Sequence, residues 1–240
     1  MSEQTEQRQV PAAGTLRLKE KEHLTDNVWA FRFTPAEPLE WTAGQYVRVE
    51  LPHDNPDEEG TKRWFTVSSA PYEGIVQITT RVTGSTFKQA LSTLPIGGEL
   101  PLIENPDGDF TWEDSDKPLV FVAGGIGITP FRSILRQRSH DGQPLGVTLV
   151  YGNRTDDIVF KEELESYAAK GAGLAIKYVV GEPLTAAKLA EFLPDLNASL
   201  VYVSGPEPMV EALSADLEST GLPKDQIKQD EFPNYDASNY

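Results

Sequence analysis

In the first half of the chain, apolar and polar residues alternate in short runs, and residues typical of turns lie between these runs. A period of two is typical of strands with one buried face, and strands at this spacing indicate a small antiparallel barrel. The predicted strands are TLRLKEKEHL, VWAFRFT, QYVRVELP, RWFTVSS, IVQITTRV and ELPLIE. One helical segment, STFKQALSTL, interrupts them and places Phe87, Leu91 and Leu94 on a common face.

After an acidic stretch at residues 113–117, apolar runs typical of buried strands alternate with amphipathic helical segments. The alternation begins with PLVFVAGG and TPFRSILRQRS and continues to LVYVSG and PMVEALSADLEST. It predicts a parallel sheet with helices on both faces. We therefore expect a flexible tail at residues 1–13, a six-stranded antiparallel β-barrel domain at residues 14–114 and a Rossmann-like α/β domain at residues 115–240.

Composition narrows the chemistry that this chain can support. The 240 residues include no cysteine, which excludes disulfides, thiolate zinc sites and cysteine-ligated iron–sulfur clusters on this chain. The net charge of −16 argues against a nucleic-acid partner, because phosphates would be repelled. His23, His53 and His140 show no metal-ligand spacing, so we expect no metal site.

The sequence predicts a cytoplasmic protein with no membrane association. Its first residues lack the apolar core of a secretory signal, and no apolar run reaches the length of a membrane span. A chain without disulfides also suits a reducing compartment.

Two glycine-containing turns in the second half each join a predicted strand to a predicted helix. VFVAGGIGITPFRSIL contains Gly124, Gly125 and Gly127, and VYVSGPEPMVEAL contains Gly205. Glycine lets the backbone approach a ligand closely, and a helix N-terminus presents unpaired N–H groups to a phosphate. Because ligands of open parallel sheets bind at the carboxyl ends of the strands, the two turns outline one crevice. A ligand-free connection remains the alternative for each turn, since the spacing is not G-x-G-x-x-G.

Seven segments, in order, resemble motifs of the ferredoxin–NADP reductase-like superfamily, whose members combine an FAD-binding barrel with a pyridine-nucleotide domain. They cover the chain from about residue 15 to the C-terminus and are WTAGQYVRVELP, RWFT, TRVTGSTFKQAL, NPDGDF, AGGIGITPFRSIL, VYGNRTDDIVFKEEL and VYVSGPEPMVEAL. The resemblance implies FAD as cofactor, NADH or NADPH as nucleotide, and electron exchange with a separate protein such as ferredoxin or flavodoxin.

The resemblance also assigns a flavin site to the barrel. Arg63 would bind the FAD pyrophosphate as a forked, permanently charged donor, Phe65 would stack on the isoalloxazine ring, and Thr66 would place its hydroxyl near flavin N5. Relatives often have tyrosine at the position of Phe65, whose phenol hydrogen bond is missing here. Further FAD contacts implied by the same segments are Trp64, Thr80, Arg81, Val82, Gly84, Ser85 and Thr86. Ser85 could also serve as an ordinary helix N-cap.

Nucleotide contacts are implied in the second domain. Those expected along the nicotinamide and pyrophosphate track are Gly125, Gly127, Thr129, Gly205, Pro206 and Met209. Ser204 stands where relatives commonly have a cysteine beside the nicotinamide. Thr66 and Ser204 are therefore the expected catalytic residues, and we expect the serine to change the rate of hydride transfer rather than abolish it.

The choice between NADH and NADPH depends on two residues. Arg154 could bind a 2′-phosphate or only the adenosine, whereas Glu182 stands where NADPH-using relatives commonly have a Ser-Arg pair. A carboxylate would repel a 2′-phosphate and could accept from a ribose hydroxyl, which favours NADH. A solvated loop charge is the alternative for Glu182. In the C-terminal tail, Phe232 and Tyr235 could cover the flavin or pack against the last helix.

The expected activity is that of an FAD-dependent NAD(P)H oxidoreductase of the ferredoxin or flavodoxin reductase type. Two alternatives remain open: an NAD(P)H:flavin reductase that uses flavin as a substrate, and a non-catalytic regulatory subunit that binds flavin and nucleotide. Arg132, Arg136 and Arg138 could form a positive docking patch for an acidic partner, or a solvated helix face.

Overall fold

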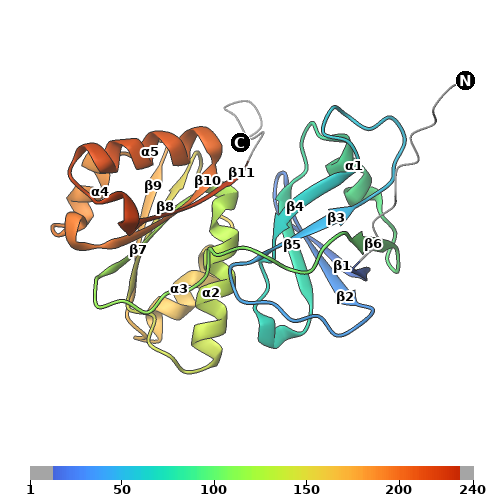
Figure 1. Cartoon of the computed structure of the whole chain (residues 1–240), viewed down its shortest axis with the longest axis horizontal. Coiled ribbons are helices and arrows are strands. Elements are labelled where there is room, and N and C mark those ends of the chain that lie inside the picture. The colour runs from blue at the N-terminus through green and yellow to red at the C-terminus, as the bar shows by residue number, and fades with distance from the viewer. Residues whose placement is uncertain (1–12, 233–240) are drawn as a thin grey trace, which may run out of the picture.

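Two sheets of different kinds organise residues 13–232, the part of the chain that the computed structural model describes. One is six-stranded and antiparallel, the other is five-stranded and parallel, and each forms its own lobe (Figure 1). The predicted combination of a barrel and a Rossmann-like sheet is confirmed.

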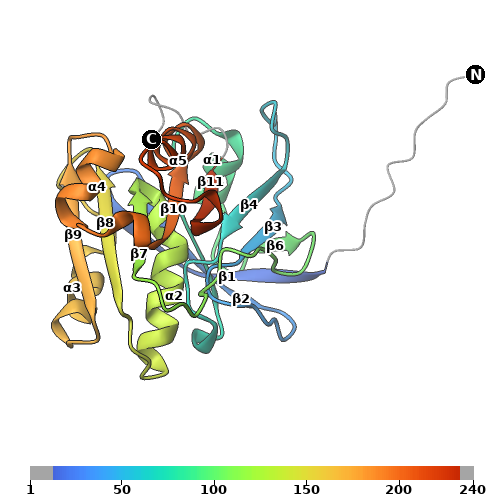
Figure 2. The same cartoon turned by 60° about the vertical axis from the view of Figure 1, so that its left-hand side comes forward.

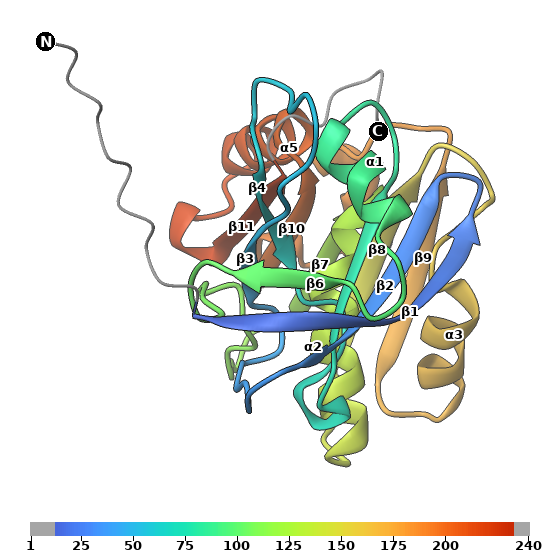
Figure 3. The ribbon, with the colours of Figure 1, turned by 90° about the vertical axis from the view of Figure 1, so that its right-hand side faces the viewer.

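The antiparallel sheet has the strand order β4-β3-β6-β1-β2-β5. Its strands are β1 (Gly14–Thr25), β2 (Val28–Pro35), β3 (Tyr46–Glu50), β4 (Lys62–Thr66), β5 (Val76–Arg81) and β6 (Glu99–Leu102). A bridge between Val67 and Ile78 joins the two outer strands, so the sheet curls into a barrel. Helix α1 (Thr86–Thr93) follows β5 and buries Phe87 and Leu91 in the barrel core (Figure 3).

The parallel sheet has the order β11-β10-β7-β8-β9. Its strands are β7 (Leu119–Gly124), β8 (Val147–Asn153), β9 (Leu174–Val180), β10 (Leu200–Pro206) and β11 (Ile227–Phe232). Its helices are α2 (Ile128–His140), α3 (Lys161–Ala169), α4 (Ala186–Phe192) and α5 (Glu207–Ser219). Short 3₁₀ turns are η1 (Pro71–Glu73) in the barrel lobe, and η2 (Gly125–Gly127), η3 (Leu196–Ala198) and η4 (Lys224–Gln226) in the second lobe.

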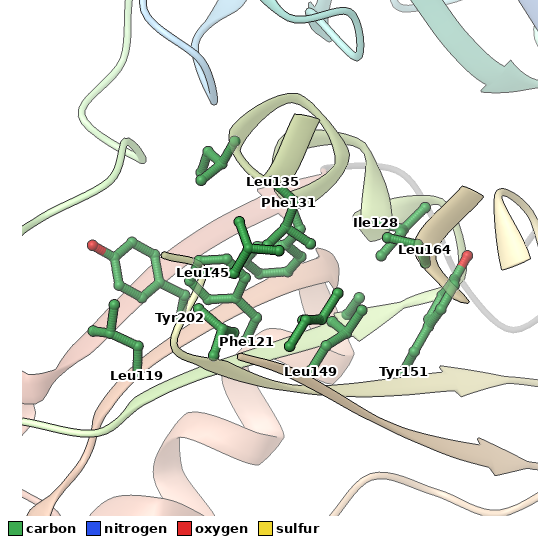
Figure 4. Close-up of a cluster of buried hydrophobic side chains, with 14 of the residues drawn as sticks. Leu119, Phe121, Ile128, Phe131, Leu135, Leu145, Leu149, Tyr151, Leu164 and Tyr202 are labelled. Carbon is green, nitrogen blue, oxygen red and sulfur yellow. The ribbon is translucent and has the colours of Figure 1, made fainter. Parts of the chain in front are cut away.

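Helices cover both faces of the parallel sheet, as the strand–helix alternation predicts (Figure 2). Alternate residues of β7 serve the two faces: Phe121 packs with α2 and α3, whereas Val120 and Val122 pack with α4 and α5. In the core beneath α2, Phe121 stacks on Phe131 with ring centroids 4.5 Å apart, and Tyr202 meets Phe121 edge-on (Figure 4). Both faces of this sheet are therefore buried under helices, which explains why its strands are continuous apolar runs.

Helix α2 ties the two lobes together. Arg132 Nη1 donates to the carbonyl of Ser68 at 2.6 Å, and Ser133 Oγ donates to the carbonyl of Ser69 at 2.6 Å. Arg136 pairs with Glu73 of η1, with Nε and Oε2 3.0 Å apart. These bonds hold the segment after β4 against the helix that follows the first glycine turn.

Neither reading of the three α2 arginines, as a docking patch or as a solvated face, describes Arg132 and Arg136. Arg132 is 4% exposed and also pairs with Glu163, which Arg136 shares. Arg138 lies over Trp112, with its guanidinium carbon 3.6 Å from the ring centroid. Arg132, which is buried, and Arg136, which is half-buried, are each paired with carboxylates, so neither guanidinium offers an unpaired positive charge to a docking partner.

None of the helices between residues 13 and 232 combines the length and the apolar character that a membrane crossing requires.

Candidate functional site

A pocket of about 810 Å³ opens between the two lobes. The barrel contributes residues of β3, β4, β5 and the turn before α1, and the second lobe contributes η2, the first turn of α2 and the end of β11. Sequence-predicted site residues that line it are Arg63, Trp64, Phe65, Thr66, Thr80, Gly84, Ser85, Thr129 and Phe232. Segments distant in the sequence therefore meet in one cavity.

Strand β4 supplies one wall of this pocket. It pairs with β3 so that Thr66 lies opposite Tyr46 and Phe65 opposite Val47. Phe65 packs against Phe87 of α1, with ring centroids 5.8 Å apart, and leaves part of its ring facing the pocket. A half-buried aromatic face of this kind can cover an apolar ring of a ligand.

Trp64 is 54% exposed, and the guanidinium carbon of Arg48 lies 4.3 Å from its ring centroid. Strand alternation turns it away from the core while it still reaches the rim of the pocket.

Arg63 is buried at the pocket wall, with its charge already balanced. Its Nη1 donates to the backbone carbonyls of residues 59, 60 and 62, and its Nη2 donates to Asp57 Oδ1 at 2.7 Å. Glu59 Oε2 lies 2.6 Å from Nε. The guanidinium is thus rigidly held, and two carboxylates sit where a bound anion would contact it.

The N-terminus of α1 lies beside this guanidinium. Ser85 is the N-cap residue but makes no side-chain cap; its Oγ accepts from Arg63 Nη2 at 3.4 Å instead. The helix is capped by Asp57, whose Oδ2 accepts from the backbone N–H of Thr86 at 2.9 Å. Burial alone would raise the pKa of Asp57, but these hydrogen bonds and the charge of Arg63 lower that pKa to about 2.

The first glycine turn passes beneath the end of β10. A Cβ added at Gly127 would lie 2.2 Å from the carbonyl oxygen of Ser204, and Gly125 has a φ of +50°. Both positions therefore need glycine for the backbone path itself. Thr129 is 2% exposed and donates its hydroxyl to the carbonyl of Ile126 at 3.1 Å. Close packing of the two turns, rather than ligand contact alone, accounts for their glycines.

Asp230 is a site residue that sequence reasoning missed. It lies opposite Ser204 in the parallel register of β10 and β11, and Ser204 Oγ donates to Asp230 Oδ2 at 3.0 Å. Asp230 lines the pocket, whereas Ser204 is fully buried behind it. The available signal was an acidic residue in the last predicted strand, but its pairing partner depends on the register.

The ionisation of Asp230 is unusual for a carboxyl group. Burial raises its pKa to about 6, nearby Glu231 and Asp109 add to the shift, and the Ser204 hydrogen bond opposes it. The pocket therefore contains a carboxyl that can hold a proton at mildly acidic pH.

A second pocket of about 420 Å³ lies at the far ends of β8 and β9. Arg154, Glu182 and Met209 line it. Glu182 is exposed, and Lys188 Nζ lies 3.0 Å from its Oε2. Met209 also packs against Gly205, where an added Cβ would lie 2.7 Å from its Cε. The β10–α5 turn thus adjoins this pocket, and the η2 turn packed against it borders the first.

Some predicted residues lie outside both pocket linings: Arg81, Val82, Thr86, Gly125, Gly127, Ser204, Gly205 and Pro206. Arg81 Nη1 donates to Asn27 Oδ1 at 2.6 Å, and Val82 packs on the barrel core. Thr86 faces the loop, where its Oγ1 accepts from the backbone N–H of Asp57 at 2.9 Å. Tyr235 lies outside the described residues.

The residues of the first pocket fit FAD. A fixed guanidinium and a helix N-terminus suit a diphosphate, a half-buried phenylalanine suits an apolar ring, and threonine hydroxyls suit the polar edge of a flavin. The volume is near the upper end of the range for small-molecule sites, as a dinucleotide requires.

Comparison with known proteins gives an independent view of the chain. Residues 121–215 match the family model described as an oxidoreductase NAD-binding domain. The flavohemoprotein-like FAD/NAD-binding domain of a Vibrio cholerae nitric oxide dioxygenase superposes with a TM-score of 0.79 at 22% identity, covering 92% of this chain and 99% of that one. That likeness establishes the fold.

Curated relatives share more sequence with the chain. They include a flavohemoprotein of Burkholderia sp. (strain TH2) at 28% identity, the reductase component of propane 2-monooxygenase of Rhodococcus jostii at 29%, and NADH-cytochrome b5 reductase 1 of Emericella nidulans at 28%. The matches cover 87%, 90% and 86% of this chain. The chain spans 56% of the first, 62% of the second and 74% of the third.

Proposed function

We propose that this chain, a member of the ferredoxin–NADP reductase-like superfamily of FAD- and NAD-binding oxidoreductases, is an FAD-dependent NAD(P)H oxidoreductase that exchanges electrons with a separate acceptor protein. The observation that carries the proposal is the pocket between the lobes, where a cationic anchor, an aromatic wall and a half-buried carboxyl converge. A structural barrel packed on a nucleotide fold would not need these groups in one cavity.

In the proposed complex, Arg63 and the N-terminus of α1 hold the flavin diphosphate, and Phe65 covers the ring. Phe232 lines the same pocket from β11 and would shield the ring from water on the other side of the cavity. Bound FAD supplies the chemistry of this class, accepting hydride from nicotinamide and releasing electrons singly. The protein's contribution is alignment, exclusion of water and a polar edge at Thr66.

Ser204 and Asp230 would control protons near the nicotinamide. Their hydrogen bond orients the Ser204 hydroxyl toward β11. Of the two residues, Asp230 is the one that lines the pocket. A carboxyl with a pKa of about 6 can hold or release a proton close to neutral pH. Arg154, Glu182 and Met209 of the second pocket would take the adenosine end of the nucleotide.

We propose NADH as the preferred donor. Glu182 faces the second pocket and would repel a 2′-phosphate, although its pairing with Lys188 reduces that repulsion. The relative from Emericella nidulans is named as an NADH-dependent reductase, which agrees with this preference.

The acceptor is proposed to be a protein that docks at the open side of the flavin pocket. Relatives are named as a component of an oxygenase and as a cytochrome b5 reductase, so the acceptor class in this superfamily varies. Ferredoxin and flavodoxin are candidates. The net charge of −16 makes steering of a strongly acidic acceptor unfavourable.

An anaerobic titration tests the proposal. The purified protein, incubated with FAD and desalted, should remain yellow and should bleach at flavin wavelengths with NADH and with NADPH, faster with NADH. Failure to bleach with either donor would support a non-catalytic binding subunit. A colourless protein that still accelerates bleaching of free flavin would support a flavin reductase. A preference for NADPH would remove the argument from Glu182.

A further inference from the structure

The carboxylate of Asp57 bridges the two groups of the barrel that suit a diphosphate. Its Oδ1 accepts from Arg63 Nη2 at 2.7 Å, and its Oδ2 accepts from the Thr86 N–H at 2.9 Å. Asp57 lines the pocket itself, together with Glu58 and Glu59 of the same loop. An acidic side chain therefore lies between Arg63 and the N-terminus of α1, at the place in the pocket that suits a diphosphate.

The Asp57 carboxylate occupies the hydrogen-bond donors that would bind a phosphate group. A carboxylate and a phosphate both accept charge-assisted hydrogen bonds from a guanidinium and from helix N–H groups. The same donors cannot serve both at full strength. Asp57 also keeps its charge near neutral pH, since its pKa is lowered to about 2.

The Asp57 carboxylate can rotate away from Arg63 and α1 while the backbone of its loop stays in place, because the Asp57 N–H and His53 Nε2 bond to Thr86 Oγ1 separately. The base of this loop is closed by the pairing of Glu50 with Lys62 and by a hydrogen bond from Leu51 N to the Thr61 carbonyl. Three carbonyls of residues 59–62 hold Arg63 Nη1 independently of Asp57. Release of the Asp57 carboxylate would therefore leave the guanidinium anchored and expose it to a ligand.

We propose that Asp57 is an internal competitor for the flavin diphosphate, which must displace its carboxylate from Arg63 and α1 for FAD to bind. The inference rests on the proposed function, because it concerns the same flavin site. When only a fraction of the protein molecules is in the state that can bind a ligand, the apparent affinity for that ligand is reduced by that fraction. Asp57 thereby lowers the affinity for FAD and leaves unchanged the affinity for a flavin that lacks a phosphate.

The variant Asp57→Asn tests this competition. Asparagine keeps the shape and an acceptor for the Thr86 N–H but removes the charge that pairs with Arg63. Titrations of the full chain followed by flavin fluorescence should show FAD binding at least about tenfold more tightly than in the wild type, the size expected of a charged hydrogen bond. The affinity for riboflavin, which has no phosphate, should change less than about twofold.

Asp54→Asn is the matched control. It removes the same charge from the same loop, but Asp54 is not part of the pocket lining and makes none of the contacts of Asp57 with Arg63 or α1. Its FAD affinity should stay close to that of the wild type. An equal gain in both variants would indicate general electrostatics and would overturn the inference.

Hydrogen exchange on the wild-type protein provides a test that does not depend on a variant folding. Addition of FAD should speed amide exchange in residues 53–60, because the loop loses the bonds of the Asp57 carboxylate and keeps only those of the Asp57 N–H and His53 Nε2 with Thr86 Oγ1. Protection of that loop by FAD, or an unchanged or weaker FAD affinity in Asp57→Asn, would show that Asp57 only holds Arg63 in place. If neither protein bleaches with NADH in the presence of FAD, the proposed function fails. If both bleach but Asp57→Asn gains no affinity, only this inference fails.

Discussion

Two carboxyl groups that line the pocket between the lobes have opposite ionisation behaviour. Asp57 has a pKa lowered to about 2, whereas Asp230 has a pKa raised to about 6. The first accepts hydrogen bonds from a guanidinium and a helix N-terminus, and the second is half-buried near two other carboxylates and accepts from the Ser204 hydroxyl. Environment rather than residue type thus decides which one holds a proton.

Substitution of Asp230 by asparagine should change the pH dependence of stability. The folded-state pKa of about 6 exceeds the ordinary value of 3.8, so the folded protein binds the proton more tightly than the unfolded chain does. The wild type should therefore lose stability as the pH rises from 4 through 6, by on the order of 1–2 kcal/mol from this group. Urea unfolding at several pH values measures it, and Asp230→Asn should lack this loss.

Ser204→Ala serves as the comparison for that experiment. It removes the hydroxyl that stabilises the ionised form of Asp230, so the decline with pH should become steeper instead of disappearing. Wild type and Asp230→Asn sharing one pH profile would contradict the raised pKa.

At the scale of elements, α2 connects the two halves of the proposed site. Its first turn carries Thr129 at the pocket wall, and one turn further on Arg132 and Ser133 bind the segment that follows β4. The strand that holds Phe65 and the turn proposed for nicotinamide are thereby linked through one rigid helix. Alignment of two ring systems depends on such links.

Arg132→Met should weaken this link. Removal of the buried cation leaves the Ser68 carbonyl without this donor and Glu163 with one arginine fewer, so the free energy of unfolding should fall by about 2–3 kcal/mol. The rate of flavin bleaching by NADH should fall in the folded variant, because the lobes are less well aligned. Urea unfolding and stopped-flow absorbance measure the two effects.

Arg138→Met is the control on the same helix. Arg138 stacks on Trp112 and donates to the Pro144 carbonyl, within or beside its own lobe, and does not bind the segment after β4. Its bleaching rate should match the wild type. Equal rate losses in the two variants would mean that the stability of α2, and not the bond between Arg132 and the Ser68 carbonyl, governs the alignment of the lobes.

For the whole molecule, charge is the property that bears on the partner. The chain has 37 acidic and 21 basic Lys or Arg residues, and the pocket lining has five carboxylates against three Lys or Arg side chains. Arg132 and Arg136 are paired with carboxylates and add no unpaired positive charge. The pocket lining therefore carries more negative than positive side chains.

Electron transfer to external acceptors should depend on salt according to the acceptor's charge. With NADH as donor, reduction of cytochrome c, a basic protein, should slow at least about threefold between 10 mM and 0.5 M NaCl, because salt screens the attraction. Ferricyanide, which is anionic, should instead be reduced faster as salt rises. The same salt dependence for both acceptors would contradict steering by the acidic surface.

The alternation of apolar and polar residues sufficed to predict both lobes, because burial of an apolar stripe or face is decided locally by its period. The RWFT segment, interpreted through the family resemblance, lines the pocket between the lobes, whereas the glycines of the two turns pack against neighbouring backbone and side chains outside its lining. What only the tertiary structure decided are the pairings: Asp230 with Ser204 through strand register, Asp57 with Arg63 and α1 through a folded loop, and Arg132 with Ser68 across two lobes. No periodic pattern in the sequence links the residues of these pairs. The ionisation state of each carboxyl group therefore depends on the neighbours that the fold places in contact with it.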